Sequence, residues 1–566
     1  MSVRYDRDKD NMVKLTTMSG MEVKSHYGPE DTKDLQYEMD LGDPGQFPFT
    51  RGIFPEMYRK RLWLRSQISC YAHPEETNKA FKTFIANGQT GLRILVDTTT
   101  HSSVDPDHPL GKYDISCNGN PTFAITEYRT MLDGIPLENV DLESACALAG
   151  GSYWTFLFII ALMEERGEDI SKLRGTNIND PIHAAIVYGC PEFADKDWEL
   201  ARKINLDLIE FSAKHTPKWF PCTPCGYDMR DAGINAHQEL AFCIANALQY
   251  YGDALNERGV RLEDLSPMAF SQSIDIDFCE AVAKFRALRR IWARLAKERL
   301  GVTDEKFMTA RIGARISGAS VSYVQKPINH TTRVALQSLA AVMGGAQSVD
   351  LAGIDEAFGL PSEEARIFGL DTQHIIAHET GAALVADPFG GSYYIESLTD
   401  QIEAGVMKLL DEIDGIGGMW ECLKTGWLQS QFDQTMVATQ KDIDEGKKYI
   451  VGVNAFKGEN GPVSEQIRQS AYPVPPAEER QRAVRKVKAL RQERDQGKLV
   501  AALTAMYEAE RNGENSIRLG IEACKAYATV GELVGTLRLA HGFAYDHYKS
   551  IDTPDYLSHL EASRAA

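Results

Sequence analysis

Short extended segments alternate with amphipathic helical segments along the middle of this chain, and this alternation limits the possible folds more than any other feature. The segments GLRILVDTTT, FPCTPCGYDM, LSPMAFSQSID, KFMTARIGARIS and AQSVDLAG are typical of strands, and helices are expected around residues 150–165, 237–251, 279–300 and 331–345. Strand and helix units that recur at roughly 30 to 50 residues predict right-handed parallel βαβ units. At this chain length we expect them to close as an α/β fold of the (β/α)8 TIM-barrel type.

The expected barrel also predicts where the functional residues lie. In such barrels the working side chains stand at the C-terminal ends of the strands. The ends of LVDTTTH, TPCGYD, FSQS, RIGARIS and SVDLAG are therefore expected around one mouth.

Two composition changes divide the chain. Residues 1–50 include EMDLGDPGQFPF, whose Gly and Pro content is typical of an extended arm. The barrel is expected over residues 51–455. Residues 456–566 begin with the Pro-rich SAYPVPPAEE region and continue as a linker and C-terminal helical segment, in which a mixed-charge helix is expected to face solvent or another subunit.

Charge and hydropathy exclude several classes of partner. A formal net charge of -19 argues against general binding of nucleic acid or an anionic membrane. The N-terminus lacks the apolar run of a signal peptide, and no apolar stretch is long enough for a membrane span. We expect a soluble, cytoplasmic protein.

The ten cysteines do not form a disulfide framework. Only Cys222 and Cys225 have CxxC spacing, and no second ligand pair lies nearby to complete a structural zinc site. The segment FPCTPCGYDM is expected to be extended, unlike the helix that opens with a thioredoxin-type pair. We therefore expect no metal site.

Several blocks resemble one family in the same order along nearly the whole chain. They include GTNINDP, CGYDMRDAG, AKFRALRRIW, DEAFGLPSEEARI and ETGAALVADPFGGSYYIESLTD. The chain is similar to the large, substrate-binding subunit of the adenosylcobalamin-dependent acyl-CoA mutases, the methylmalonyl-CoA mutase superfamily, and nearest to the 2-hydroxyisobutyryl-/isobutyryl-CoA mutase type. The resemblance implies the same (β/α)8 barrel and radical rearrangement of a carbon skeleton.

The resemblance also implies which components act with this chain. The cobalamin-binding signature DxHxxG is absent, and so is the phosphate loop GxxxxGK[ST] of a fused GTPase. The family then implies adenosylcobalamin held mainly by a separate small subunit, without which this chain is inactive. The resemblance further implies a heterotetramer, in which residues 1–50 contact the partner subunit, and a G-protein chaperone as an additional partner.

The family pattern places several residues on the substrate. Arg61 matches a position that pairs with a phosphate of coenzyme A, for which a guanidinium is suited, although a solvated arm is the alternative. Ile68 stands where the methylmalonyl enzymes have Tyr and the 2-hydroxyisobutyryl enzymes have Ile, and it offers only an apolar wall. Further substrate-binding positions are Gln67, Leu95, Glu143 and Thr176.

Two departures concern the acyl group. Tyr188 replaces the Arg that binds the free carboxylate in methylmalonyl enzymes, so burial of such a carboxylate here would be costly. Asp228 replaces the family's His, next to the matching Tyr227. Either burial keeps Asp228 protonated as a donor, or the carboxylate accepts a bond from a substrate hydroxyl or amine.

Other positions are expected to face the cofactor. His101, Asp231 and Glu356 are retained there, whereas RIGARISGAS places Arg315 and Ala319 where the family has Gln and Trp. Arg315 and Arg93 are additional cations, for which an internal ion pair is the alternative to a ligand-binding role.

Two functions remain open. The first is the large subunit of a coenzyme B12-dependent mutase for a branched or functionalised acyl-CoA that lacks a malonyl carboxylate, such as a 2-hydroxyisobutyryl-, pivalyl- or isobutyryl-type substrate. The second is a catalytically altered barrel that acts as a structural or regulatory partner of a cobalamin-binding subunit.

Overall fold

Parallel strands lie at the centre of the protein. In the part of the chain that the computed structural model describes, residues 16–68, 70–144, 151–190 and 198–562, eight short strands form two four-stranded parallel sheets. One sheet has the order β1 (Leu64–Ser66), β8 (Ser348–Asp350), β7 (Arg311–Ile316) and β6 (Ala269–Ile274). The other has the order β2 (Gly91–Ile94), β3 (Asp141–Ser144), β4 (Arg174–Asn177) and β5 (Trp219–Phe220). The α/β class with parallel strands is therefore confirmed.

The two sheets meet at two single parallel bridges. Ile68, just after β1, pairs with Arg93 of β2, and Cys225, after β5, pairs with Ser271 of β6. The amide of Ser271 donates to the carbonyl of Pro224 at 3.0 Å. The strands thus follow one another in chain order from β1 to β8, and each sheet edge has a neighbour in the other sheet.

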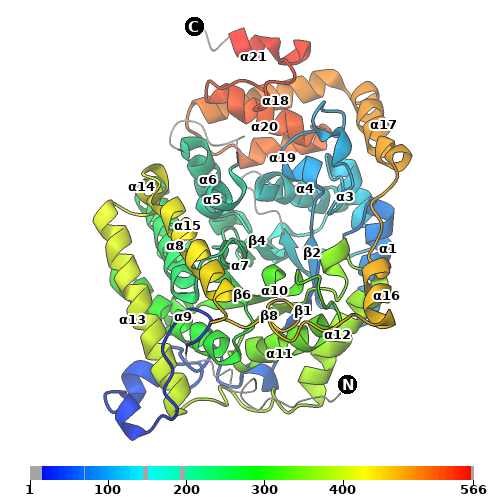
Figure 1. Cartoon of the computed structure of the whole chain (residues 1–566). Helices are drawn as coiled ribbons and strands as arrows, with labels where there is room; N and C mark the ends of the chain where they lie inside the picture. Colours follow the sequence, from blue (N-terminus) through cyan, green and yellow to red (C-terminus); the bar gives the residue numbers. More distant parts are fainter. Residues whose placement is uncertain (1–15, 69, 145–150, 191–197, 563–566) are drawn as a thin grey trace.

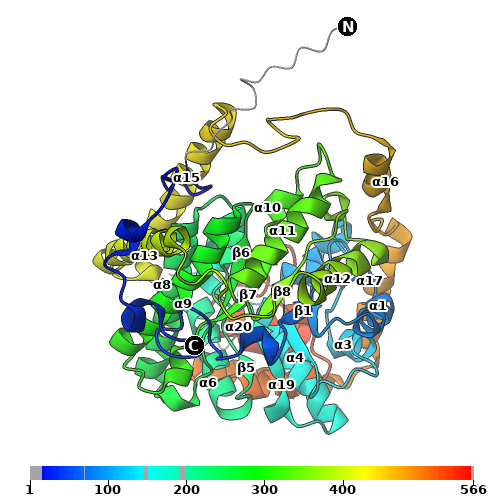
Figure 2. The same cartoon turned by 90° about the horizontal axis from the view of Figure 1, so that it is seen from below.

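Helices cover the outside of the sheets (Figure 1, Figure 2). In Figure 2 α8, α9 and α13 lie on one side of the strands, and α1, α3 and α12 lie on the other. Asn235 and Asp277 cap the first turns of α8 and α9 by accepting from backbone amides, which explains where these helices begin. The main helices are α1 (Pro74–Ala86), α3 (Ile125–Met131), α4 (Gly151–Arg166), α6 (Glu199–His215), α8 (Ala236–Arg258), α9 (Phe278–Arg299), α11 (Asn329–Met343), α12 (Glu363–His378) and α13 (Tyr393–Ile416).

Two large apolar cores stabilise the two sheets. Phe270, Ile312 and Val349 pack with residues of α8, α9 and α13 in the first core. The second core surrounds β2 to β5 and includes Trp154 together with residues of α18 (Gln496–Arg511), α19 (Ile517–Lys525) and α20 (Val530–Ala540). Figure 1 shows these C-terminal helices against α3 and α4. The C-terminal helical segment is thus part of the core around β2 to β5.

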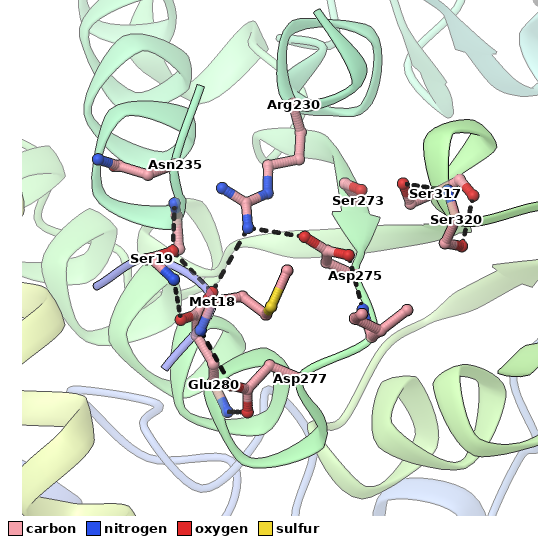
Figure 3. A network of polar contacts seen from close by, with 12 residues as sticks. Met18, Ser19, Arg230, Asn235, Ser273, Asp275, Asp277, Glu280, Ser317 and Ser320 are labelled. Atoms are coloured by element: carbon pink, nitrogen blue, oxygen red, sulfur yellow. Dashed lines mark hydrogen bonds and ion pairs between the residues drawn. The ribbon is translucent and has the colours of Figure 1, made fainter. Parts of the chain in front are cut away.

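The described part of the N-terminal arm is bonded to the helices beside the strand ends (Figure 3). The hydroxyl of Ser19 donates to Glu280 at 2.7 Å and accepts from the amide of Ala236, the first residue of α8, at 3.0 Å. The amide of Met18 donates to Asp277 at 3.1 Å. Ser19 thereby satisfies one of the amides that a helix start leaves without an internal partner.

Two features of the central segments differ from the sequence-based expectation. The second half of FPCTPCGYDM is not extended, because α7 (Gly226–Asp231) begins directly after Cys225. A Cβ atom at Gly226 would lie 2.6 Å from the side chain of Glu239, so glycine allows this helix start to approach α8 closely. LVDTTTH likewise ends its strand at Ile94, and Asp97 caps the short helix α2 (Thr98–His101).

Among the described residues, no helix has both the length and the apolar character needed to cross a membrane.

Candidate active site

Four residues from three helices meet beyond the C-terminal ends of the strands. His101 ends α2, Tyr188 ends α5 (Pro181–Tyr188), and Tyr227 and Asp228 lie in the first turn of α7. The rings of His101 and Tyr188 have centroids 5.5 Å apart in an edge-to-face arrangement. We call His101, Tyr188, Tyr227 and Asp228 the mouth cluster. His101, Tyr227 and Asp228, which follow strand ends that were expected around one mouth, thus lie together with Tyr188, which the family pattern indicated.

The start of α5 orients this cluster. Asp180 caps the helix by accepting from the amide of His183 at 3.2 Å, and Pro181 occupies the first helical position. The same carboxylate accepts from the amide of Cys225 at 2.9 Å and from the hydroxyl of Tyr250 at 2.6 Å. Asp180 consequently connects α5 to the start of α7, and this connection places His183 beside Asp228.

Asp228 forms an ion pair with a histidine that the sequence analysis did not identify. Nε2 of His183 lies 3.0 Å from Oδ2 of Asp228, and Sγ of Cys225 donates to the same oxygen at 3.3 Å. Burial alone would raise the pKa of Asp228, but the hydrogen bond and charge of His183 outweigh it and lower the pKa to about 2. Burial opposes the charged form of His183, yet Cys225 and Asp228 raise its pKa well above the ordinary value. Of the two alternatives for Asp228, this pairing favours the ionised carboxylate over the protonated donor.

His183, Cys225 and Asp228 also have the chemistry of metal ligands. One ligand atom from each lies within 4.8 Å of the other two, and no other group of this kind is found among the described residues. Nε2 of His183 and Oδ2 of Asp228 are 3.0 Å apart, as in an ion pair, and a tetrahedral zinc ion would need a fourth ligand. The three side chains are accounted for by an ion pair with a thiol donor.

A second charged group lies in the interior between the sheets. Arg93 of β2 donates to Glu143 of β3 at 3.0 Å and also pairs with Asp350 of β8. Arg315 of β7 pairs with the same oxygen of Glu143, so this contact joins strands of different sheets. We call Arg93, Glu143, Arg315 and Asp350 the ion-pair network. The internal ion pair considered for the two arginines is present in the structure.

The ion-pair network changes the titration of its members. Burial alone would raise the pKa of Glu143, but the charges of Arg315 and Arg93 outweigh it and hold the pKa below its ordinary value. Burial, and then the neighbouring charge of Arg315, lower the pKa of Arg93 to about 10. Arg93, Glu143 and Arg315 are therefore charged near neutral pH, and opposite charges are in direct contact.

A cavity of about 260 Å³ leads to the ion-pair network. Arg61, Asp141 and Arg311 line one end, and Arg93, Glu143 and Arg315 line the other. The guanidinium of Arg61 lies 3.6 Å from Asp141, and its side chain is 70% exposed. The Arg315 guanidinium lies 5.4 Å from the centroid of the Tyr227 ring, so the inner end of the cavity adjoins the mouth cluster.

Only some of the other predicted substrate positions line this cavity. Thr176 lines the cavity and bonds to the Phe220 carbonyl at 3.2 Å, whereas Gln67, Ile68 and Leu95 do not line it. Gln67 is buried and donates to the carbonyl of Arg366 at 2.9 Å, away from the cavity. Ile68 and Leu95 are half-buried beyond the ends of β1 and β2.

The predicted cofactor positions lie near the same strand ends. Asp231 accepts from the Ser317 hydroxyl and the Gly318 amide, each at 2.8 Å, and burial raises its pKa to about 7. Ala319 is exposed in α10 (Gly318–Val321), and Glu356 accepts from the amide of Gly353 at 2.8 Å. Burial lowers the pKa of His101 to about 4, so its imidazole is neutral. The structure thus offers a neutral ring and a small exposed residue at this end.

Comparisons with known proteins give consistent matches. Residues 16–543 match the family model described as methylmalonyl-CoA mutase. The 2-hydroxyisobutanoyl-CoA mutase large subunit of Aquincola tertiaricarbonis is 35% identical over 527 residues, which cover 92% of this chain and 91% of that protein. Mitochondrial methylmalonyl-CoA mutase of Homo sapiens is 34% identical over 528 residues, which cover 93% of this chain and 68% of that protein. Methylmalonyl-CoA mutase of Rhizobium meliloti is 31% identical over 528 residues, which cover 93% of this chain and 72% of that protein.

Proposed function

Because the chain belongs to the methylmalonyl-CoA mutase family, we propose that it is the large subunit of a coenzyme B12-dependent mutase for an acyl-CoA without a malonyl carboxylate. The chain is an isomerase of the mutase type. Its relatives are named mutases, so the alternative of a catalytically altered barrel with a structural role is not favoured.

The pairing of the interior arginines carries the substrate proposal. Arg93 and Arg315 both have carboxylate partners, and Tyr188 presents a phenol where a carboxylate-binding enzyme of this family has Arg. Asp228 adds a negative charge to the same mouth cluster. A second carboxylate on the acyl group would therefore be desolvated beside an anion, and the two arginines of the ion-pair network already have carboxylate partners.

The cavity suggests how coenzyme A is held. Arg61 at the outer end is exposed and is suited to a phosphate, and the mouth cluster adjoins the inner end. We propose that the pantetheine arm lies in this cavity, with the acyl group between Ile68, Tyr188 and Asp228. This arrangement assumes that the two sheets close as one (β/α)8 barrel, which is supported by the bridges Ile68 to Arg93 and Cys225 to Ser271.

Adenosylcobalamin is the cofactor of this family, and it supplies an organic radical when it is bound. In this chain His101, Asp231, Ala319 and Glu356 would face it, with Arg315 behind them. The fit is supported by buried polar atoms at the ends of β3 and β4: within the described residues, the hydroxyl of Ser144 and both amide atoms of Asn177 have no partner. Such atoms suit a ring that carries amide side chains. Tyr188 and Ile68 would exclude water from the acyl group.

The partners follow from the same proposal. The Aquincola relative is named a large subunit, so we propose a small cobalamin-binding subunit for this chain as well, in a heterotetramer. Residues 1–50 would contact it, since Ser19 holds the described part of the arm next to α8 and α9. A G-protein chaperone remains a further proposed partner.

Reconstitution tests the function directly. The chain is combined with a DxHxxG small subunit and adenosylcobalamin, and a panel of acyl-CoA thioesters is screened for isomerisation by chromatography and mass spectrometry. We expect turnover of a branched ester without a free carboxylate and much slower turnover of methylmalonyl-CoA. Equal or faster conversion of methylmalonyl-CoA would contradict the proposed substrate class.

A further inference from the structure

One oxygen of the Asp228 carboxylate has no protein partner. The ion pair with His183 and the thiol donor of Cys225 both use Oδ2. Within the described part of the chain, no hydrogen bond or ion pair reaches Oδ1. The Asp228 side chain is 15% exposed, whereas the side chain of His183 is completely buried behind it. Asp228, and not His183, is therefore the member of the pair that can touch a ligand.

The surroundings of Asp228 leave its charge available to a donor. His183 belongs to α5 and Asp228 to α7, and Asp180 fixes both helices by capping α5 and accepting from the amide of Cys225. The other charged group nearby, Arg315, is bonded to Glu143. The ion pair thus holds a carboxylate in one orientation, with Oδ1 as the free acceptor.

An ionised oxygen that a substrate shields from water needs a hydrogen-bond donor. An alkyl group over Oδ1 would remove water from the charge without donating a hydrogen bond, which makes binding unfavourable. A second carboxylate would be repelled. A hydroxyl or an ammonium group donates to this oxygen, and sites built for such a donor strongly reject analogues that lack it.

We propose that Oδ1 of Asp228 accepts a hydrogen bond from a hydroxyl or ammonium group on the acyl chain, and that His183 is the positioning residue that directs this oxygen toward the substrate. The inference rests on the proposed function, because it names the class of acyl-CoA that the same site selects. It assigns selectivity to a pair of residues from two helices that lie far apart in the sequence.

Three esters of equal shape provide the test. In 2-hydroxyisobutyryl-CoA, 2-aminoisobutyryl-CoA and pivalyl-CoA the same carbon carries a hydroxyl, an ammonium or a methyl group. Binding to the full-length chain is measured by titration calorimetry. We expect the hydroxyl or the ammonium ester to bind at least about 30-fold more tightly than the pivalyl ester. The relative affinities of the first two esters distinguish the two donors.

Variants separate the roles of the two residues. Asp228→Asn should reduce the selectivity to less than about threefold, with the larger loss for the ammonium ester, because the charge is removed. His183→Leu should also lose the selectivity but keep the affinity for pivalyl-CoA. His183→Gln retains a donor toward Oδ2 and should restore most of the selectivity, a difference that a packing role alone would not produce. Asp34→Asn and His215→Gln, at exposed positions, serve as controls.

The outcomes distinguish this inference from the proposed function. Tight binding of all three esters with equal affinity would overturn the inference and leave the proposed function intact. Binding of none of them would overturn both. An equivalent of zinc in the purified chain that disappears in Asp228→Asn would show a metal site in place of the ion pair, and it too would overturn the inference.

Discussion

Arg315 of β7 and Glu143 of β3 form an ion pair that joins the two sheets through the interior of the protein. Glu143 also binds Arg93, which in turn binds Asp350. Each member of the ion-pair network comes from a different strand, and positive and negative charges alternate. Since an unpaired buried charge is costly, the network favours one register between the sheets.

Because Glu143 has two arginine partners and Arg315 has one carboxylate partner among the described residues, their substitutions are expected to lower the free energy of unfolding by unequal amounts. Glu143→Gln leaves Arg315 with no carboxylate in contact among the described residues, so we expect a loss of about 3–5 kcal/mol in the free energy of unfolding. Arg315→Met leaves Glu143 paired with Arg93 and should cost less than half as much. Urea denaturation measures both, with Arg261→Met at an exposed ion pair as the control. A larger loss in Arg315→Met would contradict the shared role of Glu143.

An arginine at position 188 is expected to strengthen the binding of an acyl-CoA that carries a free carboxylate. Tyr188→Arg introduces a guanidinium at the mouth cluster, where it can pair with a substrate carboxylate. We expect methylmalonyl-CoA to bind about tenfold more tightly to this variant than to the wild type, which equals about 1.4 kcal/mol. Titration calorimetry measures the affinity, and Tyr188→Gln is the neutral control. Equal affinities in Tyr188→Arg and Tyr188→Gln would show that the acyl carboxylate does not reach this position.

Removal of the Arg61 side chain is expected to weaken the binding of coenzyme A whatever acyl group it carries. Its side chain is largely exposed and only 3.6 Å from Asp141, so it is free to turn toward a phosphate. Arg61→Ala should weaken the binding of coenzyme A itself by about tenfold, and the loss should shrink at high salt. Arg59→Ala, at a neighbouring exposed position, should bind as the wild type does. The alternative of a solvated arm requires both variants to behave alike.

Asp231 predicts a dependence of stability on pH. Burial raises its pKa from 3.8 to about 7 near Ser317, Gly318, Tyr227 and Asp228, so the folded protein keeps a proton that the unfolded chain releases. This carboxyl group therefore lowers the stability progressively as the pH rises from about 4 to about 7. Asp231→Asn should remove that slope.

The measurement compares the variant with the wild type at two pH values. Between pH 4 and pH 8, urea denaturation should show Asp231→Asn gaining on the order of 3 kcal/mol relative to the wild type. Asp34→Asn, at an exposed acid of the arm, should show no such change. A difference that does not vary with pH would mean that Asp231 is ionised in the folded protein.

The sequence predicts the strands with apolar residues better than the polar ones. β6, β7 and β8 lie within segments that were expected to be strands, and most side chains of AFSQSI and RIGARI are buried. β1, β3 and β4 were not identified as separate strands. Their residues include Arg65, Glu143 and Thr176, and two of these line the cavity. A polar interior removes the apolar alternation that indicates a strand.

The site shows a similar division. Tyr188, Tyr227, Asp228 and His101 could be expected at one mouth because family positions and strand ends agree. His183 could not, since its contact with Asp228 depends on how α5 and α7 approach each other, and no local spacing encodes that approach. Without His183, the sequence could not decide between a protonated Asp228 and an ionised one.

The C-terminal helices impose an order on biosynthesis. Leu503, Leu533 and Leu537 pack in the same core as Leu92 and Leu142 of β2 and β3. A ribosome makes β2 and β3 early and residues 496–540 almost last. Apolar surface around β2 and β3 therefore stays uncovered until translation is nearly finished, so a nascent chain that stalls before α18 exposes an incomplete core and is prone to aggregate without chaperones.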